Sequence, residues 1–201
     1  SSDNYIFEKI NLEIFNSKKY LIIGPNGSGK STLLGLMAGV YYPSKGKINI
    51  HSNETAYVSA YPMIIKDSLR NNLLYGNETL QISEEKLIDY IHTFELYKDF
   101  EAKDLNKNVS NKTLSSGQMQ KIAFIRAFIS NPRILFLDES TANLDTRSKE
   151  IVKNLLSKKD FTIINSTHNL EDFQNYDYSI ELSVTEDGLT ELLFQDLNST
   201  D

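Results

Sequence analysis

The chain has 201 residues, a formal net charge of -6 and no cysteine, with 40% hydrophobic and 24% charged residues. This length suits one core of ordinary size, and the composition is that of a globular protein. Without cysteine, disulfides, thiolate metal sites and cysteine nucleophiles are excluded. The acidic balance argues against a general nucleic-acid binder, because phosphate backbones select a basic face, so we expect no nucleic-acid partner.

The sequence contains no stretch that approaches the roughly 20 apolar residues of a membrane-spanning helix. The N-terminal residues also lack the charged and then apolar pattern of a signal peptide. We therefore expect this chain itself to be soluble. If the protein works at a membrane, another chain or a further part of the protein must supply the spanning helices.

The first predicted elements are strands around one helix. Alternating polar and apolar residues predict a half-exposed strand over residues 5–15, and a short apolar run predicts another over 19–23. A helix is expected over residues 33–38, after a glycine-rich loop. Two further short strands are expected over 47–50 and 56–59.

The middle of the chain changes to helical periodicity over residues 66–100, where two apolar faces indicate two helices. Ser83, followed by two glutamates, is the predicted start of the second helix. A polar loop is expected over residues 104–113. This segment therefore predicts a helical insertion between strands of the main sheet.

The last part of the chain alternates helices with strands. Helices are expected over residues 114–130 and 148–156, and the apolar runs 134–137 and 161–165 predict buried parallel strands. Two apolar segments separated by Glu-Asp-Gly predict a terminal hairpin over residues 178–194.

A phosphate-binding motif lies between the strand 19–23 and the helix that follows it. Four residues match G-x-x-x-x-G-K-S/T: Gly24, Gly29, Lys30 and Ser31. Glycines let backbone N–H groups approach an anion, and the helix N-terminus adds unpaired donors. We expect Lys30 to contact the β- and γ-phosphates and the Ser31 hydroxyl to ligate Mg²⁺. The expected nucleotide-binding residues of this loop are Gly24, Pro25, Asn26, Gly27, Ser28, Gly29, Lys30, Ser31 and Thr32.

Three further groups follow predicted buried strands. Asp138 is expected to help hold Mg²⁺, and Glu139 to orient or deprotonate an attacking water. His168 follows the strand 161–165 and is expected to hydrogen-bond the γ-phosphate. The alternative is that these residues only end strands or lie on the surface. Their convergence with the phosphate loop at one edge of a parallel sheet favours an active site.

The order of these motifs resembles the nucleotide-binding domain of the ATP-binding cassette (ABC) ATPases. Residues 114–118, Leu-Ser-Ser-Gly-Gln, are similar to the family's signature Leu-Ser-Gly-Gly-Gln. Residues 137–145 are similar to its Asp-Glu pair and D-loop, and Thr167-His168 to its switch histidine. The resemblance spans roughly residues 6–184.

The resemblance implies an α/β P-loop NTPase fold with a mostly parallel central sheet, an antiparallel β subdomain and an inserted helical subdomain. We expect a single domain over residues 1–201, with a catalytic lobe of 1–60 and 114–201 and a helical subdomain of about 61–113. The implied cofactors are ATP and Mg²⁺, and the implied reaction is ATP hydrolysis, with Glu139, His168 and Lys30 as catalytic residues.

The resemblance also implies partners. ATP on the phosphate loop of one protomer is covered by the signature loop of a second nucleotide-binding domain, in a homodimer or a pseudo-symmetric dimer. The residues of that loop are Ser115, Ser116, Gly117 and Gln118. Residues 57–62 and 68–76 resemble exporter-type members, in which this region receives the transmembrane domains of the transporter. The expected location is the cytoplasmic face of a membrane.

Three positions depart from the family pattern. Ala60 stands where the family usually has a glutamine that contacts Mg²⁺ and water, so we expect weaker metal dependence or slower turnover. Ser116 replaces the first signature glycine. Tyr5 is the expected adenine-stacking residue, although it lies several residues closer to the phosphate loop than the family's aromatic does.

Two alternatives to an exporter-type ATPase stay open. One is an ATP-binding regulatory module with little hydrolysis, which Ala60 favours and the intact Glu139 argues against. The other is a soluble ABC ATPase that acts on nucleic acid or the ribosome. The acidic charge and the lack of long insertions argue against this second class.

Overall fold

The computed structural model describes residues 5–97, 99, 101–158, 160–168 and 175–199, with residues 102 and 103 described through their backbone only. The chain divides into two compact units, and each is described here by itself. The first unit consists of Ser1–Tyr57, Arg133–Glu139 and Asp160–Asp201. The second consists of Val58–Pro132 and Ser140–Lys159.

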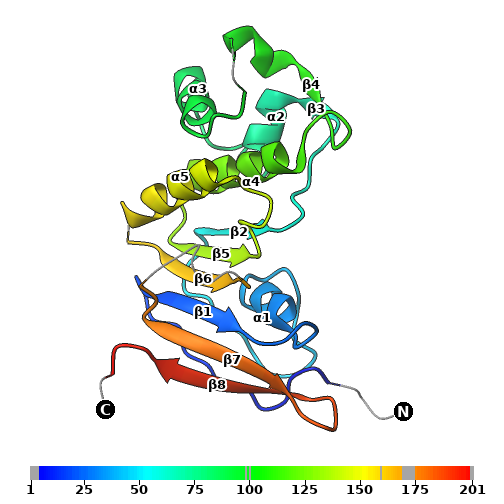
Figure 1. Ribbon diagram of the computed structural model, residues 1–201, viewed down its shortest axis with the longest axis vertical. Helices are drawn as coiled ribbons and strands as arrows, with labels where there is room; N and C mark the ends of the chain where they lie inside the picture. The colour runs from blue at the N-terminus through cyan, green and yellow to red at the C-terminus, as the bar shows by residue number, and fades with distance from the viewer. Residues whose placement is uncertain (1–4, 98, 100, 159, 169–174, 200–201) are drawn as a thin grey trace. The chain divides into compact units, whose positions relative to one another are not determined.

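Six strands form one sheet among the described residues, in the order β2-β5-β6-β1-β7-β8 (Figure 1). Their bounds are β1 Lys19–Ile23, β2 Thr55–Ser59, β5 Ile134–Asp138, β6 Thr162–Ser166, β7 Tyr178–Val184 and β8 Thr190–Asp196. β5, β6, β1 and β7 are parallel neighbours, and β8 returns antiparallel to β7 as the expected hairpin. The predicted α/β fold with a mostly parallel sheet is therefore confirmed.

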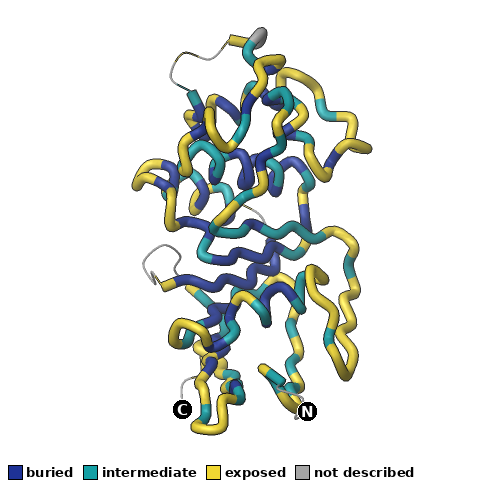
Figure 2. Tube along the Cα trace, turned by 90° about the vertical axis from the view of Figure 1, so that its right-hand side faces the viewer, coloured by how far each residue is buried: buried dark blue, intermediate teal, exposed yellow. Residues whose placement is uncertain are grey.

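The core of the first unit lies between this sheet and helix α1 (Lys30–Met37), which contacts β5 and β6. Apolar runs without polar alternation form strands that are covered on both faces. The buried cluster consists of Tyr20, Ile22, Leu33, Leu34, Phe136, Ile164, Ile180 and Leu182. Figure 2 shows these central strands as mostly buried. Each such side chain contributes about 1.5–3 kcal/mol on burial, so this core holds the strand ends in a fixed arrangement.

The second unit is mainly helical. Its elements are β3 Asp67–Ser68, α2 Leu69–Leu74, α3 Glu84–Thr93, the 3-10 helix η1 Ala102–Asn106, β4 Asn108–Val109, α4 Ser116–Ser130 and α5 Thr146–Ser157. Ser83 caps α3 by accepting from the Lys86 backbone N–H, which confirms the predicted helix start. Phe94 and Phe128 pack against Phe124 in the core of this unit. Within the described ranges, every helix is too short or too polar to cross a lipid bilayer.

The prediction of a strand over residues 5–15 is wrong. The segment makes one isolated bridge, in which Phe7 pairs with Thr190. Lys9 has a φ of 54°, in the left-handed region, and this conformation interrupts an extended strand. Residues 5–15 therefore have the alternating pattern of a strand but pair with a neighbouring strand at one residue only.

The prediction of a strand over residues 47–50 is also wrong. Ile48 and Ile50 are 41% and 37% exposed, so little burial holds this segment in a ladder. The segment instead lines an open groove of about 1540 Å³ in the first unit.

The polar loop expected over residues 104–113 contains part of η1 and the short strand β4, which pairs with β3. Antiparallel pairing thus occurs in β7–β8 and β3–β4 and not around residues 47–50.

Helix α4 packs against α2 within the second unit. This unit therefore includes residues 116–130, which the sequence placed in a catalytic lobe. The two compact units are defined by the contacts within each of them, and this division is separate from the functional one. The expected lobes, 1–60 with 114–201 and about 61–113, stay a prediction.

Candidate active site

Three parallel strands of the first unit end at the same level of the sheet. Ser166 at the end of β6 lies opposite both Ile22 of β1 and Asp138 of β5. The phosphate loop follows β1, Glu139 follows β5, and His168 follows β6. Groups that are far apart in the sequence therefore meet at one sheet edge, where parallel sheets bind their ligands.

The phosphate loop depends on glycine at two positions. Gly29 has a φ of 89° and is the N-cap of α1, a left-handed conformation that glycine adopts without steric cost. A Cβ at Gly24 would lie 2.5 Å from the Leu182 carbonyl oxygen, so β7 leaves no room for a side chain there. Residues 25–27 between them are exposed. The loop thus presents backbone to solvent at the N-terminus of a helix, an arrangement that favours anions.

The Lys30 side chain is buried and turns back onto this loop. Its ammonium group donates to the carbonyl oxygens of Gly24, at 2.9 Å, and Pro25, at 3.0 Å. The positive charge is therefore held at the loop backbone. A phosphate on the loop would compete with these carbonyls for the same N–H groups.

The Asp138 carboxylate lies between two hydroxyl groups. The Ser31 hydroxyl donates to Oδ1 at 2.9 Å, and the Tyr57 hydroxyl donates to Oδ2 at 2.9 Å. Asp138 is 9% exposed. Burial and the neighbouring carboxylate raise the pKa of the Tyr57 phenol, so this group stays a donor.

The oxygen atoms of Ser31 and Asp138 suit a magnesium site that has few ligands from the protein. Mg²⁺ prefers hard oxygen ligands and usually binds through one or two carboxylates together with substrate phosphates and water. In the part of the chain that the structure describes, no cluster of three or more histidine or acidic residues could hold a metal alone. The residues therefore suit a metal that binds together with a phosphate-containing ligand.

Glu139 and His168 form the second pair of groups at this edge. Glu139 has a φ of 47°, a left-handed conformation that costs a non-glycine residue about 1 kcal/mol or more. Its backbone N–H donates to the Ser166 carbonyl at 2.8 Å. Its Oε1 lies 3.0 Å from His168 Nε2, and the two side chains are 39% and 50% exposed. Solvent therefore has access to both groups.

The signature residues lie in the second unit, at the N-terminus of α4. The Ser115 hydroxyl accepts from the Gln118 backbone N–H at 3.2 Å, and Gln118 Oε1 accepts from the Ser115 N–H at 3.0 Å. This reciprocal capping box fixes the helix start. Ser116 is exposed and Gly117 is partly exposed in the first turn, where helix N–H groups have no intrahelical acceptor.

Ala60 also lies in the second unit, where its carbonyl accepts from the Asn143 side-chain amide at 3.2 Å. Asn143 belongs to the segment 137–145, which also contains Asp138 and Glu139. A methyl group at position 60 has no oxygen or nitrogen with which to ligate a metal or hold a water. The side chain at position 60 therefore cannot replace the glutamine that the family usually has there.

The predicted residue Tyr5 contacts a lysine, with Lys45 Nζ 4.9 Å from its ring centroid. The adenine-stacking role of Tyr5 stays a prediction.

Three residues that the sequence did not single out also lie at this site: Phe7, Tyr57 and Thr190. The ring of Phe7 lies against the loop, where a Cβ on Gly29 would approach it to 2.8 Å. The buried Thr190 of β8 donates its hydroxyl to the Ser28 carbonyl at 3.1 Å. Phe7 and Thr190 lie outside every motif, and the exporter-like stretch that begins at Tyr57 gave this residue no role of its own. Only the fold brings these three residues to the site.

Comparison with protein families agrees with this geometry. The model of the family described as ABC transporter matches residues 7–142, which is more than half of the chain. The chain belongs to the ABC transporter family. It corresponds to the ATP-binding and ATP-hydrolysing domain of that family, which implies that it binds ATP.

The curated relatives of this ABC domain are much longer proteins. ABC transporter B family member 17 of Arabidopsis thaliana is 33% identical over 90% of this chain and 16% of its own length. ATP-dependent permease MDL1 of Candida albicans is 32% identical over 96% of this chain and 32% of its own length. The ABC domain thus spans no more than about a third of these two relatives.

A solved structure shares the fold of this ABC domain. It is described as a bacterial Atm1-family ABC exporter with ATP bound, and it matches with a TM-score of 0.78. The match has 23% sequence identity and covers 91% of this chain and 35% of that one. At this identity the likeness supports the fold.

The contact between Thr190 and Ser28 predicts an effect of β8 on nucleotide binding. Replacing Thr190 with valine keeps the shape of the side chain but leaves the buried Ser28 carbonyl without its hydroxyl donor. We expect Thr190→Val to weaken ATP affinity about three- to tenfold, because an unpaired buried carbonyl displaces the loop. Titration with a fluorescent ATP analogue measures this change.

The matched control is Thr185→Val in the same hairpin. The Thr185 hydroxyl donates to the Leu189 carbonyl at 3.1 Å, within the hairpin turn, so ATP affinity should not change. Thr190→Ser should restore most of the affinity, because it returns the hydroxyl. Equal affinity in Thr190→Val and the unmodified chain would contradict a role for this hydroxyl in shaping the loop.

Proposed function

We propose that this chain binds and hydrolyses ATP as the motor domain of an exporter-type ABC transporter. The observation that carries the proposal is the shared sheet edge. Asp138 ends β5 at the level of Ile22 in β1, Glu139 follows Asp138, and the phosphate loop that leads to Lys30 follows β1. The name of one relative, an ATP-dependent permease, supports the coupling of ATP to transport. The chain spans a minor part of such relatives, and we propose that the rest of the transporter couples ATP hydrolysis to transport.

Each polar group at the edge has a proposed role. The phosphate loop N–H groups and Lys30 bind the β- and γ-phosphates, and Ser31 and Asp138 hold Mg²⁺, which neutralises phosphate charge when bound. Glu139 orients or deprotonates the attacking water. His168 hydrogen-bonds the γ-phosphate and, through its contact with Glu139, aligns that carboxylate.

The signature residues Ser115, Ser116, Gly117 and Gln118 are proposed to act on a second nucleotide-binding domain. Their place at a capped helix start supports this role, because exposed first-turn N–H groups and the helix dipole favour a phosphate. A homodimer or a pseudo-symmetric dimer would bring this helix start to the ATP of the partner. The remaining partners are proposed to be transmembrane domains, which would place this chain at the cytoplasmic face of a membrane.

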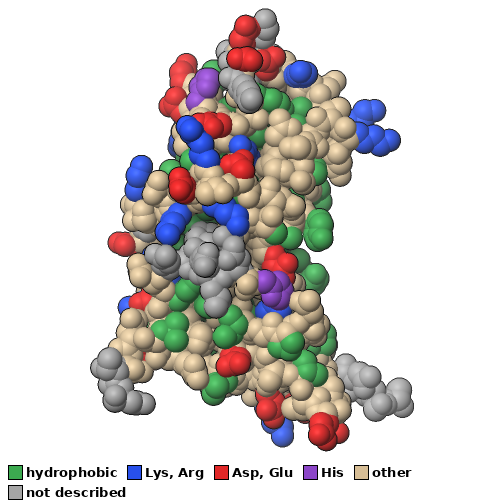
Figure 3. Space-filling view, viewed as in Figure 1, with side chains coloured by type: hydrophobic (Ala, Val, Ile, Leu, Met, Phe, Trp, Pro, Cys, Tyr) green, Lys and Arg blue, Asp and Glu red, His purple; other side chains and the backbone are tan. Residues whose placement is uncertain are grey.

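Acidic and basic side chains are interspersed on the face that Figure 3 draws. Together with the net charge of -6, this mixture supports a protein partner over nucleic acid. A nucleic-acid-binding ABC ATPase is therefore not the function that we propose.

ATP-dependent dimerisation tests the proposed function directly. Glu139→Gln should bind ATP and hydrolyse it very slowly, because the amide cannot act as a base. We expect this variant to elute from gel filtration with ATP and Mg²⁺ at about twice the 22.9 kDa of one chain, and without ATP as a monomer.

The control combines Glu139→Gln with Lys30→Ala, which removes the ammonium from the phosphate loop. This double variant should stay monomeric with ATP. If Glu139→Gln alone also stays monomeric at saturating ATP, the dimer mechanism is wrong. If both variants form dimers, ATP bound to this loop is not the cause of dimerisation.

A regulatory module with little hydrolysis is the second candidate, and Ala60 is the observation that favours it. Ala60→Gln restores a group that can hold water and metal. For a hydrolysing motor domain we expect the ATPase rate to rise about fivefold, which corresponds to about 1 kcal/mol in the barrier. A phosphate-release assay measures the rate. If both the unmodified chain and Ala60→Gln bind ATP without turnover, the regulatory function replaces the motor.

A further inference from the structure

Both oxygens of the Asp138 carboxylate have a hydroxyl donor. Ser31 holds Oδ1 and Tyr57 holds Oδ2, each at 2.9 Å. All three residues belong to the first unit, so their contacts lie within one compact body. A carboxylate held on both oxygens has little freedom to rotate about its terminal bond.

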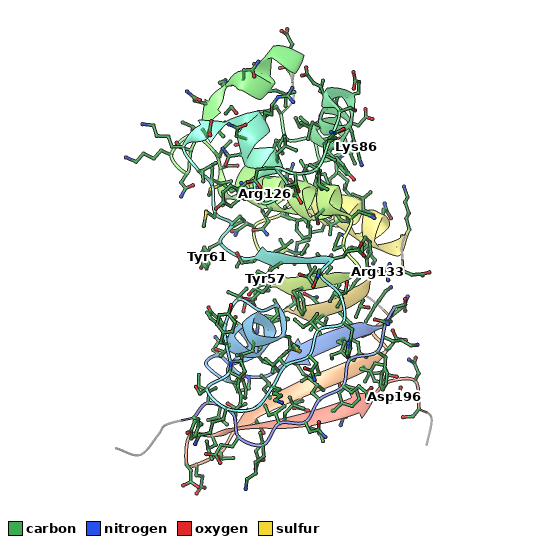
Figure 4. All side chains as sticks on the ribbon, turned by 180° about the vertical axis from the view of Figure 1, so that it is seen from behind. Tyr57, Tyr61, Lys86, Arg126, Arg133 and Asp196 are labelled. Carbon is green, nitrogen blue, oxygen red and sulfur yellow. The ribbon has the colours of Figure 1, made fainter. Side chains whose placement is uncertain are left out.

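The Tyr57 side chain is itself held by packing. It lies on β2, the strand next to β5, and Figure 4 labels it there. Its ring packs against the buried cluster that includes Phe136 and Leu34. The phenol is therefore a rigid donor that is independent of the phosphate loop, whereas Ser31 lies in the first turn of α1, directly after that loop.

The two hydroxyls can have different tasks when a metal is present. A serine oxygen bound to Mg²⁺ still has its proton to donate, but the metal draws this oxygen toward itself. The Tyr57 hydroxyl binds only Oδ2 of Asp138, so it does not block Oδ1, the oxygen that faces Ser31 and that would face the metal or its water. Donors behind a metal-binding carboxylate fix its direction and are a common requirement for tight binding.

We propose that Tyr57 is a positioning residue of the metal site, whose hydroxyl holds the Asp138 carboxylate in the direction that Mg²⁺ binding requires. This inference rests on the proposed function, because it assigns a further residue to the same nucleotide site. It also gives the site a source of order that does not depend on position 60, where alanine has no polar side chain.

The test uses Tyr57→Phe, which removes one oxygen and keeps the ring. Mn²⁺ is the probe, because electron paramagnetic resonance reports its free concentration during titration of the protein with a non-hydrolysable ATP analogue. We expect Mn²⁺ affinity to fall about tenfold. The affinity for the same analogue in EDTA should change less than about twofold, because no metal is then present to depend on Asp138.

Two reference variants bracket this result. Tyr42→Phe removes a phenol from a side chain that is 90% exposed, and it should leave both affinities unchanged. Asp138→Asn should lower Mn²⁺ affinity at least as far as Tyr57→Phe does. Loss of the analogue affinity in EDTA by Tyr57→Phe would indicate a structural role and overturn the proposal.

Mn²⁺ binding by Tyr57→Phe that is equal to or tighter than that of the unmodified chain would also overturn it. Tighter binding would mean that the hydroxyl competes with the metal for the carboxylate. The proposed function has a separate failure: an unmodified chain that binds neither the analogue nor Mn²⁺ with it. If the unmodified chain binds both and Tyr57→Phe matches it, only the role of Tyr57 is lost.

Discussion

The structure of the candidate site depends on the register of three parallel strands. Pairing of Ser166 with both Ile22 and Asp138 brings the ends of β1, β5 and β6 to one level. A shift by one residue would turn every side chain of a strand to the opposite face, so the buried core and the position of the polar groups are specified together. Hydrophobic burial therefore determines where the phosphate loop meets Asp138, Glu139 and His168.

The polar groups at this edge are held by contacts within the chain. Lys30 is paired with loop carbonyls, Asp138 with two hydroxyls, and Glu139 with His168. Such pairing lowers the cost of holding charges near a low-dielectric core.

The chemistry of the site was predictable from sequence where a motif or a strand end marked it. Apolar runs directly before Gly24, Asp138 and Thr167 predicted the shared edge, because buried parallel strands have a distinctive composition. Residues without such a mark were missed: Tyr57 contacts Asp138, and Thr190 contacts Ser28, from strands far away in the sequence. The strand prediction over 5–15 failed because alternation describes one strand and says nothing of its partner. The strand prediction over 47–50 failed because the segment is too exposed for burial to hold it in a ladder.

The central claim is that a triphosphate binds at this sheet edge. A crystal structure of the chain with Mg²⁺ and a non-hydrolysable ATP analogue tests it most directly. The account predicts β- and γ-phosphate oxygens within hydrogen-bond distance of the N–H groups of residues 27–30, with the metal beside Ser31 and Asp138. A nucleotide bound elsewhere, while this loop is open to solvent, would contradict it.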